Sequence, residues 1–450
     1  MGAVLGVTRA YFLGASVKEV GIGLAGYGTV GKGVVDVLRK NAAVIAQRTG
    51  VRLSVVHVGA RRGASDLANT GITVSQDVFD VVKDPSVDIC LELMGGKETA
   101  QGWIEAAFAR GKPVVTANKA LIAESGTALL DRARAAGVPL LFEAAVAGGI
   151  PILKALREGL SANQIHWVAG IINGTANYIL SEMLAGRSFA EVLAEAQALG
   201  YAEADPTFDV EGIDAAHKLA ILASMSFGTP LAFDDVFIEG ISALQPDDLL
   251  YADNLGYRVK HLGLAHRTEA GVELRVHPTL VPKDSLLANV NGVMNAVMVH
   301  SDAVGSSLFY GPGAGGSATA SSVIADVIEI ARCSGLASEQ LVPALGFQDQ
   351  VSTPTVPVAE TTSAYYLRFQ VTDGPGVLAH ITQLLGEANI SIEAVIQKPV
   401  HSQTGLVSII ILTQPVKETI MDGVLSRVAA FPESGAPVVK LRVASLEGLN

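Results

Sequence analysis

Cysteine is scarce in this sequence: its 450 residues include only Cys90 and Cys333. Two cysteines are too few for a disulfide framework or a zinc cluster, so we expect a reducing, cytoplasmic location. Long apolar runs are lacking too, because none reaches the roughly 18–20 residues that a membrane helix requires. Lysine and arginine form no cluster, and the net charge is −12. That charge argues against nucleic acid or an anionic membrane as a partner.

Hydrophobic residues, in contrast, make up 49% of the chain, and charged residues make up 17%. This composition is typical of a folded protein with large cores, and the length predicts two or three domains. The segment Ala10–Val17 is too short and weakly flanked for a signal peptide, and we interpret residues 1–17 as an extension. Across residues 1–150, short apolar runs alternate with helical patterns. The sequence therefore predicts an α/β fold that starts with a doubly wound sheet.

A glycine motif lies where the first predicted strand, residues 20–25, meets the first predicted helix. A second register of the same motif, at residues 21–26, would leave its glycines inside the strand. In the first register, one glycine makes the turn, the next admits a pyrophosphate, and the third lets helix and strand pack. The spacing therefore predicts a dinucleotide site at Gly26, Gly28 and Gly31, in a turn that also contains Tyr27, Thr29 and Val30.

Two arginines follow the next predicted strand, residues 53–58. A site that prefers NAD would carry an acidic residue there, whereas this chain has Arg61 and Arg62. Guanidinium groups suit a 2′-phosphate. We therefore expect NADP(H) to be preferred, with NAD(H) possible; the alternative is a solvated arginine pair.

A lysine follows the predicted strand at residues 112–117. Ligands of parallel sheets bind beyond the carboxyl ends of the strands, which makes Thr116 and Lys119 candidates for the cofactor or substrate site. Position alone is equally compatible with an ordinary lysine at a helix start. Farther along, a glycine-rich stretch at residues 310–316 includes Gly313 and precedes a helical pattern. We expect residues 311–347 to return to the nucleotide domain and complete it.

A different pattern starts at residue 151 and defines a predicted α+β substrate and dimerisation domain over residues 151–310. A turn at Gly174 and Thr175 opens a helix, so its free N–H groups could hold a substrate carboxylate. Simple turn chemistry is the alternative. Four histidines are scattered over residues 231–310 without metal-ligand spacing, and we interpret them as structural. They are His261, His266, His277 and His300.

The stretch at residues 201–227 is the most informative part of the chain. Its first part is an acidic loop with Glu203 and Asp209, and a helical pattern starts near residue 213. That helix is apolar almost all round, which predicts burial, yet Asp214 and Lys218 share one of its faces. A buried carboxylate and ammonium group are costly unless they are paired and used. The alternative, an ion pair on a solvated helix face, has no polar face to occupy.

The C-terminal residues restart as an independent unit after a polar linker at residues 348–362. Residues 363–450 read as βαββαβ, a ferredoxin-like module. Asp373 and Gly376 lie in the turn before its first helix, and Asn389 is expected to open the next strand. Together they form a candidate effector site. The module's sheet edges are natural sites for pairing with another copy.

With these residues described, the chain closely resembles homoserine dehydrogenase, in the form that carries a C-terminal ACT regulatory domain. The resemblance covers nearly the whole chain after the extension. It rests on seven motifs: GYGTVGKGV (26–34), TANKAL (116–121), EAAVAGGIPI (143–152), NGTANYIL (173–180), YAEADPTFDVEGIDAAHKLA (201–220), YGPGAGG (310–316) and YYLRFQVTDGPGVLAHIT (365–382).

The resemblance implies reversible, NAD(P)-dependent interconversion of L-homoserine and L-aspartate 4-semialdehyde in threonine, methionine and isoleucine biosynthesis. It implies that Lys218 exchanges the proton, that Asp214 and Glu203 orient the amino acid, and that Lys119 lies near the reacting hydroxyl. It also implies a monovalent-cation site for Na⁺, L-threonine as inhibitor, and a homodimer or homotetramer. The residues of the cation site would be Glu143, Val146, Gly148 and Ile150.

Two other functions remain compatible with the residues. One is another NAD(P)-dependent amino-acid dehydrogenase. The other is a non-catalytic amino-acid sensor whose nucleotide domain has lost its activity, and the intact Asp214 and Lys218 pair argues against it.

Overall fold

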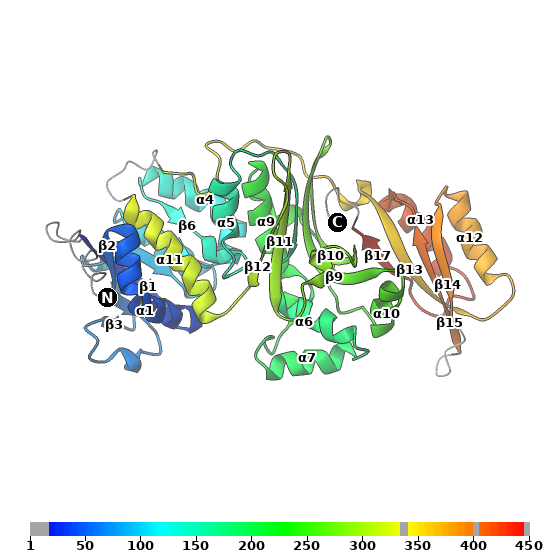
Figure 1. Cartoon of the computed structure of the whole chain (residues 1–450), viewed down its shortest axis with the longest axis horizontal. Coiled ribbons are helices and arrows are strands. Elements are labelled where there is room, and N and C mark those ends of the chain that lie inside the picture. The colour runs from blue at the N-terminus through cyan, green and yellow to red at the C-terminus, as the bar shows by residue number, and fades with distance from the viewer. Residues whose placement is uncertain (1–17, 334–340, 399–404, 445–450) are drawn as a thin grey trace, which may run out of the picture.

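The computed structural model describes residues 18–333, 341–398 and 405–444. The molecule is elongated, with the N-terminal domain at one end, the substrate domain in the middle and the C-terminal module at the other end (Figure 1). The N-terminal extension predicted at residues 1–17 lies outside the described residues. Within the described part of the chain, no helix is both long and apolar enough to cross a membrane.

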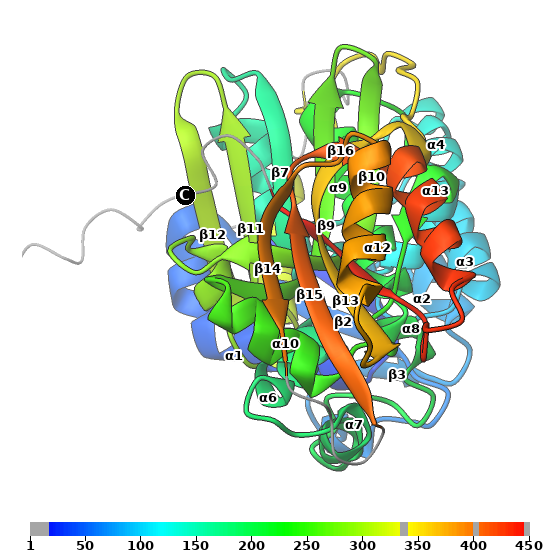
Figure 2. The ribbon, with the colours of Figure 1, turned by 90° about the vertical axis from the view of Figure 1, so that its right-hand side faces the viewer.

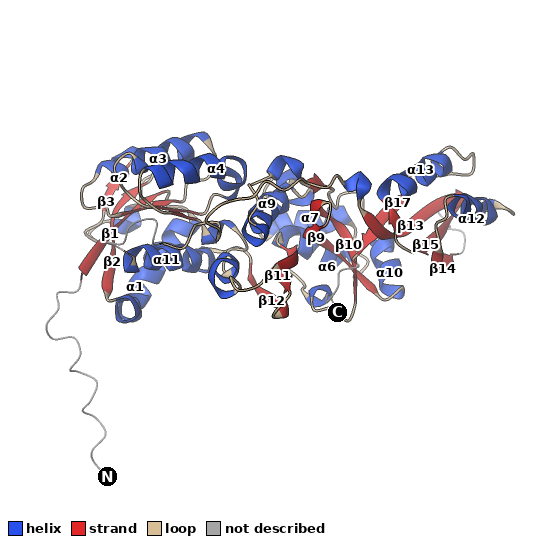
Figure 3. Ribbon diagram, turned by 90° about the horizontal axis from the view of Figure 1, so that it is seen from above, coloured by secondary structure: helices blue, strands red, loops and turns tan. Residues whose placement is uncertain are grey.

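The N-terminal domain is built on a six-stranded parallel sheet in the order β3-β2-β1-β4-β5-β6. Its inner strands are apolar on both faces, because helices cover both faces. Figure 3 shows α2, α3 and α4 on one side of the sheet and α1 and α11 on the other. The strands are β1 (Lys18–Ala25), β2 (Val51–Gly59), β3 (Thr73–Ser75), β4 (Ile89–Glu92), β5 (Val114–Thr116) and β6 (Leu140–Leu141). The helices are α1 (Thr29–Thr49), α2 (Phe79–Lys83), α3 (Glu98–Phe108), α4 (Lys119–Ala135) and α11 (Gly316–Arg332).

Helix α11 comes from far along the chain and packs against α1, as the sequence predicted for this segment. The contact is close: a Cβ added to Gly33 would lie 2.4 Å from the Gly316 carbonyl oxygen. The predicted glycine-rich loop was wrong in one detail. Residues 310–312 are not loop but the end of strand β12 (Gly305–Pro312), where they pair with β11. Only residues 313–315 connect this strand to α11.

The second sheet has 11 strands and runs through both remaining parts of the molecule. Nine of them form the path β12-β11-β7-β9-β10-β17-β13-β15-β14, while β8 pairs with β10 and β16 with β13. The strands of the middle part are β7 (Ile165–Ile171), β8 (Phe237–Ile238), β9 (Tyr257–Thr268), β10 (Gly271–Pro282) and β11 (Met294–Ser301). Its helices are α5 (Ile152–Lys154), α6 (Gly174–Met183), α7 (Phe189–Ala198), α8 (Thr207–Val210), α9 (Ile213–Phe227) and α10 (Pro246–Asn254).

The C-terminal module has the predicted βαββαβ order, with the short strand β16 added. Its elements are β13 (Thr362–Thr372), α12 (Val377–Glu387), β14 (Ile392–Gln397), β15 (Leu406–Thr413), β16 (Val416–Lys417), α13 (Glu418–Ala429) and β17 (Val439–Val443). Figure 2 shows α12 and α13 on the outer face of its sheet.

One edge of the module is not free for another copy. Strand β17 pairs in parallel with β10 of the substrate domain, through Thr279 with Arg442 and Leu280 with Val443. The predicted linker is also docked, because Val272 exchanges backbone hydrogen bonds with Pro354 and Val356. The module is therefore an extension of the substrate-domain sheet rather than a tethered unit.

Candidate active site

Helix α9 is the buried centre of the molecule (Figure 1), as its composition predicted. Every residue from Asp214 to Phe227 is buried. Left-handed glycines, Gly212 and Gly228, bound the helix at its two ends. Asp214 and Lys218 lie one turn apart, so the helix carries both charges into the interior on one face.

The carboxylate of Asp214 is shared by two amines. The Nζ of Lys218 lies 2.7 Å from Asp214 Oδ2, and the Nζ of Lys119 lies 2.9 Å from Asp214 Oδ1. Lys218 also donates to the carbonyl oxygen of Ile172 at 2.7 Å, at the end of β7. Lys119 is the first residue of α4, whose N-cap Asn118 accepts from the backbone. Helices α4 and α9 thus bring two amines to one carboxylate, and the carbonyl oxygen after β7 holds one of these amines.

Asn173 completes this cluster, and the sequence analysis did not select it. Its Nδ2 donates to Asp209 Oδ1 at 2.7 Å and to Asp214 Oδ2 at 2.8 Å. Its Oδ1 accepts from the backbone of Ala176 and caps helix α6. The available signal was an asparagine directly before a helix start, which is a common N-cap.

The neighbouring turn residues have local roles. The hydroxyl of Thr175 donates to the carbonyl oxygen of Tyr201 at 2.6 Å and so ties α6 to the acidic segment. A Cβ on Gly174 would lie 2.6 Å from the Val293 carbonyl oxygen, so a side chain does not fit there. The acidic segment is not all loop, because residues 207–210 form α8. Asp209 lies in that helix, whereas Glu203 is exposed in the loop before it.

Burial and electrostatic attraction shift the pKa values of this cluster in different directions. Burial lowers the pKa of Lys218 below its usual value, and Asp214 offsets only part of that shift. Burial opposes the charged form of Asp214, but the two lysines hold its pKa well below the usual range. Burial also opposes the charge on Lys119, whose pKa Asp214 nevertheless raises. One amine is therefore tuned to lose its proton and the other to keep it.

The remaining acid of the cluster behaves differently. Burial raises the pKa of Asp209, although the hydrogen bond from Asn173 opposes the shift. Asp209 and Glu203 both help to raise the pKa of Lys119, so their charges lie close to that amine. The arrangement offers carboxylates to an ammonium group beside an amine that can exchange a proton.

The glycine turn after β1 has the geometry that its sequence predicts. Gly26 has φ +104°, and a Cβ there would lie 2.5 Å from the Leu93 carbonyl oxygen. A Cβ on Gly31 would lie 2.4 Å from the Gly26 carbonyl oxygen, so α1 packs closely on the turn. Gly28 is the N-cap of α1 and would meet no atom within 4 Å. The helix N-terminus at Thr29 and Val30 is thus open to a phosphate group.

Other predicted cofactor residues lie around the same sheet edge. Arg61 and Arg62 are exposed in the turn after β2, and Tyr27 donates to Asp66 at 2.9 Å. Thr116 ends β5, but its hydroxyl donates to buried Glu92 at 2.6 Å. Burial raises the pKa of Glu92, and the hydrogen bonds that it accepts oppose the shift. The sequence analysis missed Glu92, which lies in an otherwise apolar strand.

The segment from Glu143 to Ile150 contains the residues predicted to form a monovalent-cation site. Glu143 is buried, and its carboxylate accepts from the backbone of Leu153 at 3.0 Å and of Lys154 at 2.7 Å. Ala147 and Gly148 both have left-handed φ, and the Gly148 carbonyl oxygen accepts from the hydroxyl of Ser322 at 2.6 Å. Among the described residues, no three His, Cys, Asp or Glu side chains gather to hold a metal. A carboxylate and backbone carbonyls offer a cation oxygen ligands only.

Gly313 lies where the chain returns to the nucleotide domain. A Cβ there would lie 1.7 Å from Asn295 Oδ1, and a Cβ on Gly148 would lie 2.4 Å from the Gly313 carbonyl oxygen. The two segments that connect the nucleotide domain to the substrate domain, at Gly148 and at Gly313, are therefore in direct contact.

The three candidate effector residues are not brought together. Gly376 has φ +97° and caps the start of α12, next to exposed Asp373. Asn389, with φ +56°, lies in the turn after that helix and does not open β14, which starts at Ile392. Since α12 has 11 residues, the two ends are about 16 Å apart. A ligand that touches both ends would require a second copy.

Comparisons with known proteins agree along the chain. The homoserine dehydrogenase family matches residues 151–328, its NAD-binding domain matches residues 26–143, and the ACT domain matches residues 365–430. A homoserine dehydrogenase of Pseudomonas aeruginosa is 55% identical, covering 95% of this chain and 100% of that protein. One of Neisseria gonorrhoeae is 50% identical, covering 95% and 99%. The crystal structure of a homoserine dehydrogenase from Thiobacillus denitrificans matches with TM-score 0.89 and 49% identity, covering 95% and 99%.

Proposed function

The chain belongs to the homoserine dehydrogenase family, and we propose how its own residues carry out the interconversion of L-homoserine and L-aspartate 4-semialdehyde. It is an NAD(P)-dependent oxidoreductase, which decides against a non-catalytic sensor and against a dehydrogenase for another amino acid. A nicotinamide cofactor supplies the hydride chemistry. The protein must therefore supply a group that exchanges the hydroxyl proton.

Lys218 is that group in our proposal. The observation that carries it is a buried amine with a lowered pKa, held 2.7 Å from Asp214 at the end of β7. In homoserine oxidation the neutral amine of Lys218 accepts the hydroxyl proton, and in aldehyde reduction its ammonium form returns that proton. Lys119, whose pKa is raised, remains charged and stabilises negative charge on the reacting oxygen.

The acids around the amines bind the amino-acid end of the substrate. Glu203, Asp209 and Asp214 provide carboxylates for its α-ammonium group, and Asn173 fixes two of them in place. The substrate carboxylate is held by the helix start at Gly174 and Thr175. In this arrangement one charged end of the substrate faces acids while the other faces a helix N-terminus.

The cofactor assignments extend from the glycine turn. The pyrophosphate is held by Gly26, Gly28, Thr29, Val30 and Gly31, and the nearby residues are Tyr27, Thr116, Lys119 and Gly313. Arg61 and Arg62 select NADP(H) over NAD(H). Exposed guanidinium groups beyond β2 support this preference, since a 2′-phosphate is a bidentate partner for them. We also assign Na⁺ to Glu143 and the carbonyls of Val146, Gly148 and Ile150.

Regulation and assembly complete the proposal. The ACT module binds L-threonine, and this binding inhibits the enzyme. The site is formed by Asp373 and Gly376 of one subunit and Asn389 of another. The enzyme is therefore a homodimer or homotetramer. The separation along α12 supports a site shared between copies. The alternative is a module that only dimerises the protein. We further propose that the enzyme works in the cytoplasm, where both of its free cysteines stay reduced.

The primary test is homoserine-dependent formation of NADPH and of NADH by the full-length enzyme at alkaline pH. Turnover with homoserine is expected, faster with NADP⁺ at low cofactor concentration. No turnover with either cofactor would refute the assignment of Lys218 and its neighbours in this chain.

Threonine inhibition is best tested without removing the module. Deleting residues 362–450 would strip β17 from β10 and expose the apolar core that Tyr366, Ile410 and Leu441 share with α6 and α10. In the intact chain, the double substitution Asp373→Asn with Asn389→Ala should raise the inhibitory threonine concentration roughly tenfold or more. Unchanged inhibition in that variant, or none in the parent enzyme, would contradict the regulatory assignment.

A further inference from the structure

A cavity of about 430 Å³ lies at the junction of the substrate domain and the C-terminal module, apart from the active site described above. One wall is the hairpin of β9 and β10, and the other walls are β17, the start of β13 and the docked linker. Its volume is within the range of small-molecule sites. No residue assigned to homoserine, the cofactor or the threonine site lines it.

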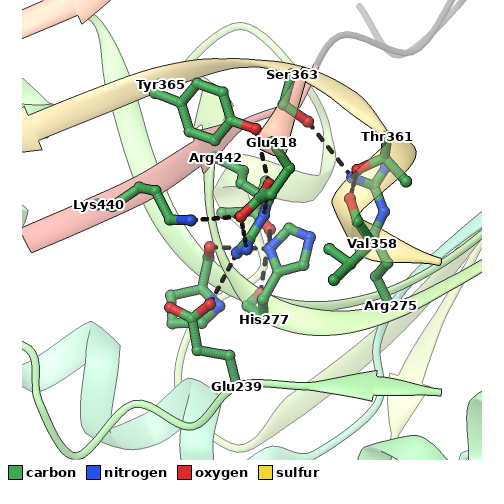
Figure 4. Close-up of polar contacts among 12 residues, drawn as sticks. Glu239, Arg275, His277, Val358, Thr361, Ser363, Tyr365, Glu418, Lys440 and Arg442 are labelled. Atoms are coloured by element: carbon green, nitrogen blue, oxygen red, sulfur yellow. Dashed lines mark hydrogen bonds and ion pairs between the residues drawn. The ribbon is translucent and has the colours of Figure 1, made fainter. Parts of the chain in front are cut away.

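The floor of the cavity is cationic and buried. Arg275, His277 and Thr279 follow one another at every second position of β10 and therefore share one face of that strand. Arg442 reaches the floor from β17 and is tied to Glu418 and Glu239 (Figure 4). All four side chains are at least nine-tenths buried. Arg442 is thus matched by two carboxylates, and Arg275 is the floor group that suits a ligand group with negative charge.

Two polar atoms of this floor lack hydrogen-bond partners in the described part of the chain. They are Arg275 Nε and His277 Nε2. The rest of the Arg275 guanidinium contacts Glu273 at 2.9 Å. More weakly, it contacts Thr361 and Ser363 at 3.3 and 3.4 Å (Figure 4). Buried polar groups are nearly always paired, and an unpaired one costs free energy that a ligand would recover.

The two unpartnered atoms differ in kind. Arg275 Nε is a hydrogen-bond donor. Burial, with the nearby charges of Arg442 and Arg275, lowers the pKa of His277 well below its usual value, so its ring is neutral. The Thr279 hydroxyl donates to the His277 carbonyl oxygen at 3.1 Å and lies 2.9 Å from Nδ1, which assigns the ring proton to Nδ1. His277 Nε2 is then an acceptor. The floor therefore offers a ligand one hydrogen-bond donor and one acceptor.

The rim of the cavity has the opposite charge. Glu269 and Glu360 are exposed at its mouth, where Glu360 also pairs with Lys417 at 2.9 Å. Glu273 is mostly buried between mouth and floor. This rim would repel a phosphate or another polyanion, while the arginines of the floor would repel a simple cation. A ligand that directs a carboxylate toward the arginines of the floor and leaves an ammonium group beside the glutamates of the rim matches both charges. Leu264, Val356 and Val443 add apolar wall for a small side chain.

We propose that this cavity is a binding site for a zwitterionic α-amino acid with a small side chain, distinct from the threonine site at the ends of α12. The α-carboxylate binds Arg275, and the α-ammonium group binds the glutamates at the mouth. Because the walls belong to both β10 and β17, an occupied cavity joins the catalytic sheet to the module. The proposal does not depend on the roles assigned to Lys218 or Asp373.

Equilibrium dialysis of the full-length enzyme against radiolabelled L-alanine, L-valine and L-serine tests this site, while L-threonine is left out because it has its own proposed site at the ends of α12. At least one of them should bind the parent enzyme, and Arg275→Met should weaken that binding roughly tenfold or more, because it removes the charged partner of the carboxylate. As a matched control, Arg427→Met removes an exposed guanidinium of the same module, which pairs with Glu387, and should leave binding unchanged. Unchanged affinity in Arg275→Met would overturn the proposal.

A second variant covers the case in which Arg275→Met does not fold. The double substitution Glu269→Gln with Glu360→Gln alters only exposed side chains, and it should weaken binding roughly two- to fivefold. Homoserine turnover without added amino acid should stay at the parent level, which separates this site from the catalytic assignments. Wild-type affinity in this variant, no binding of any of the three amino acids to the parent enzyme, or displacement of label by inorganic phosphate would each contradict an amino-acid site.

Discussion

Two buried charge clusters of this enzyme differ in how completely their charges are matched. At the junction, Arg368 forms a bidentate pair with Asp248 at 2.6 and 3.0 Å, and the two side chains are 2% and 0% exposed. In the active site, two lysines share the single carboxylate of Asp214, and the pKa of Lys218 is lowered because its burial is not fully offset. A matched arginine pair fixes one geometry, whereas an under-matched lysine can exchange a proton.

Replacing the under-matched amine should have the largest effect. Lys218→Ala is expected to lower turnover roughly 10²–10⁴-fold, the usual range for a lost general acid–base group. The affinity for the cofactor should hardly change, because the glycine turn at residues 26–31 lies in another domain. Steady-state kinetics and cofactor titration measure both.

The control for that variant is Lys112→Ala. Lys112 also donates to a backbone carbonyl, that of Asp84, but it lies away from the site. Turnover of Lys112→Ala should match the parent enzyme. Near-normal turnover of Lys218→Ala would remove Lys218 from its catalytic role.

Breaking the matched pair should affect stability rather than chemistry. Arg368→Met leaves the carboxylate of Asp248 buried without its charged partner, which is expected to cost roughly 3–5 kcal/mol of unfolding free energy. Urea denaturation measures this loss, while turnover per folded molecule should be retained. For comparison, Arg427→Met breaks an exposed pair with Glu387 and should cost about 1 kcal/mol or less. Equal losses in the two variants would contradict the distinction between buried and exposed pairs.

The exposed arginines of the nucleotide domain provide a third case, in which the charges are left for a ligand. Replacing both Arg61 and Arg62 with Ala should weaken NADP⁺ binding roughly tenfold or more, because the 2′-phosphate loses two positively charged partners. NAD⁺ has no 2′-phosphate and should bind about as before. Cofactor titrations of parent and variant compare the two, and equal weakening would refute the 2′-phosphate assignment.

The pH dependence of homoserine oxidation sharpens the same comparison. The neutral form of Lys218 accepts the proton, so the rate should rise with pH and level off above the pKa of Lys218, which burial lowers. The reduction needs the ammonium form, and its rate should fall over the same range. Asp214 raises the pKa of Lys218, so in Asp214→Asn that pKa falls further and the rise in oxidation should move to lower pH. A movement to higher pH would contradict this electrostatic assignment.

Local patterns in the sequence predicted most elements correctly. Alternating strands and helices gave the parallel sheet, and an all-round apolar composition gave the buried helix α9 with Asp214 and Lys218 on one face. The pairing of β17 with β10 was missed, because an apolar strand does not indicate which distant edge it joins. Residues 310–312 were read as loop, since glycine and proline dominate a stretch that tertiary pairing makes a strand.

The candidate site shows the same limits. Lys119 and Asp214 were selected separately, and only the fold showed that their side chains meet at 2.9 Å. Asn173 and Glu92 were missed because each matters through hydrogen bonds to residues distant in the sequence. Asn389 was placed at a strand start, but its left-handed φ puts it in the turn that ends α12.

The return of α11 to the nucleotide domain has a consequence for synthesis on the ribosome. The last strand of the parallel sheet ends at Leu141, but the helix that covers one face of it ends only at Arg332. At roughly 5–20 residues per second, the ribosome needs about 10–40 s to make the intervening chain. Until then Val34 and Leu38 of α1, which pack with α11 in the finished enzyme, lack part of their cover. The first domain to emerge is therefore among the last to be completed, and the nascent chain depends on the substrate domain for its closure.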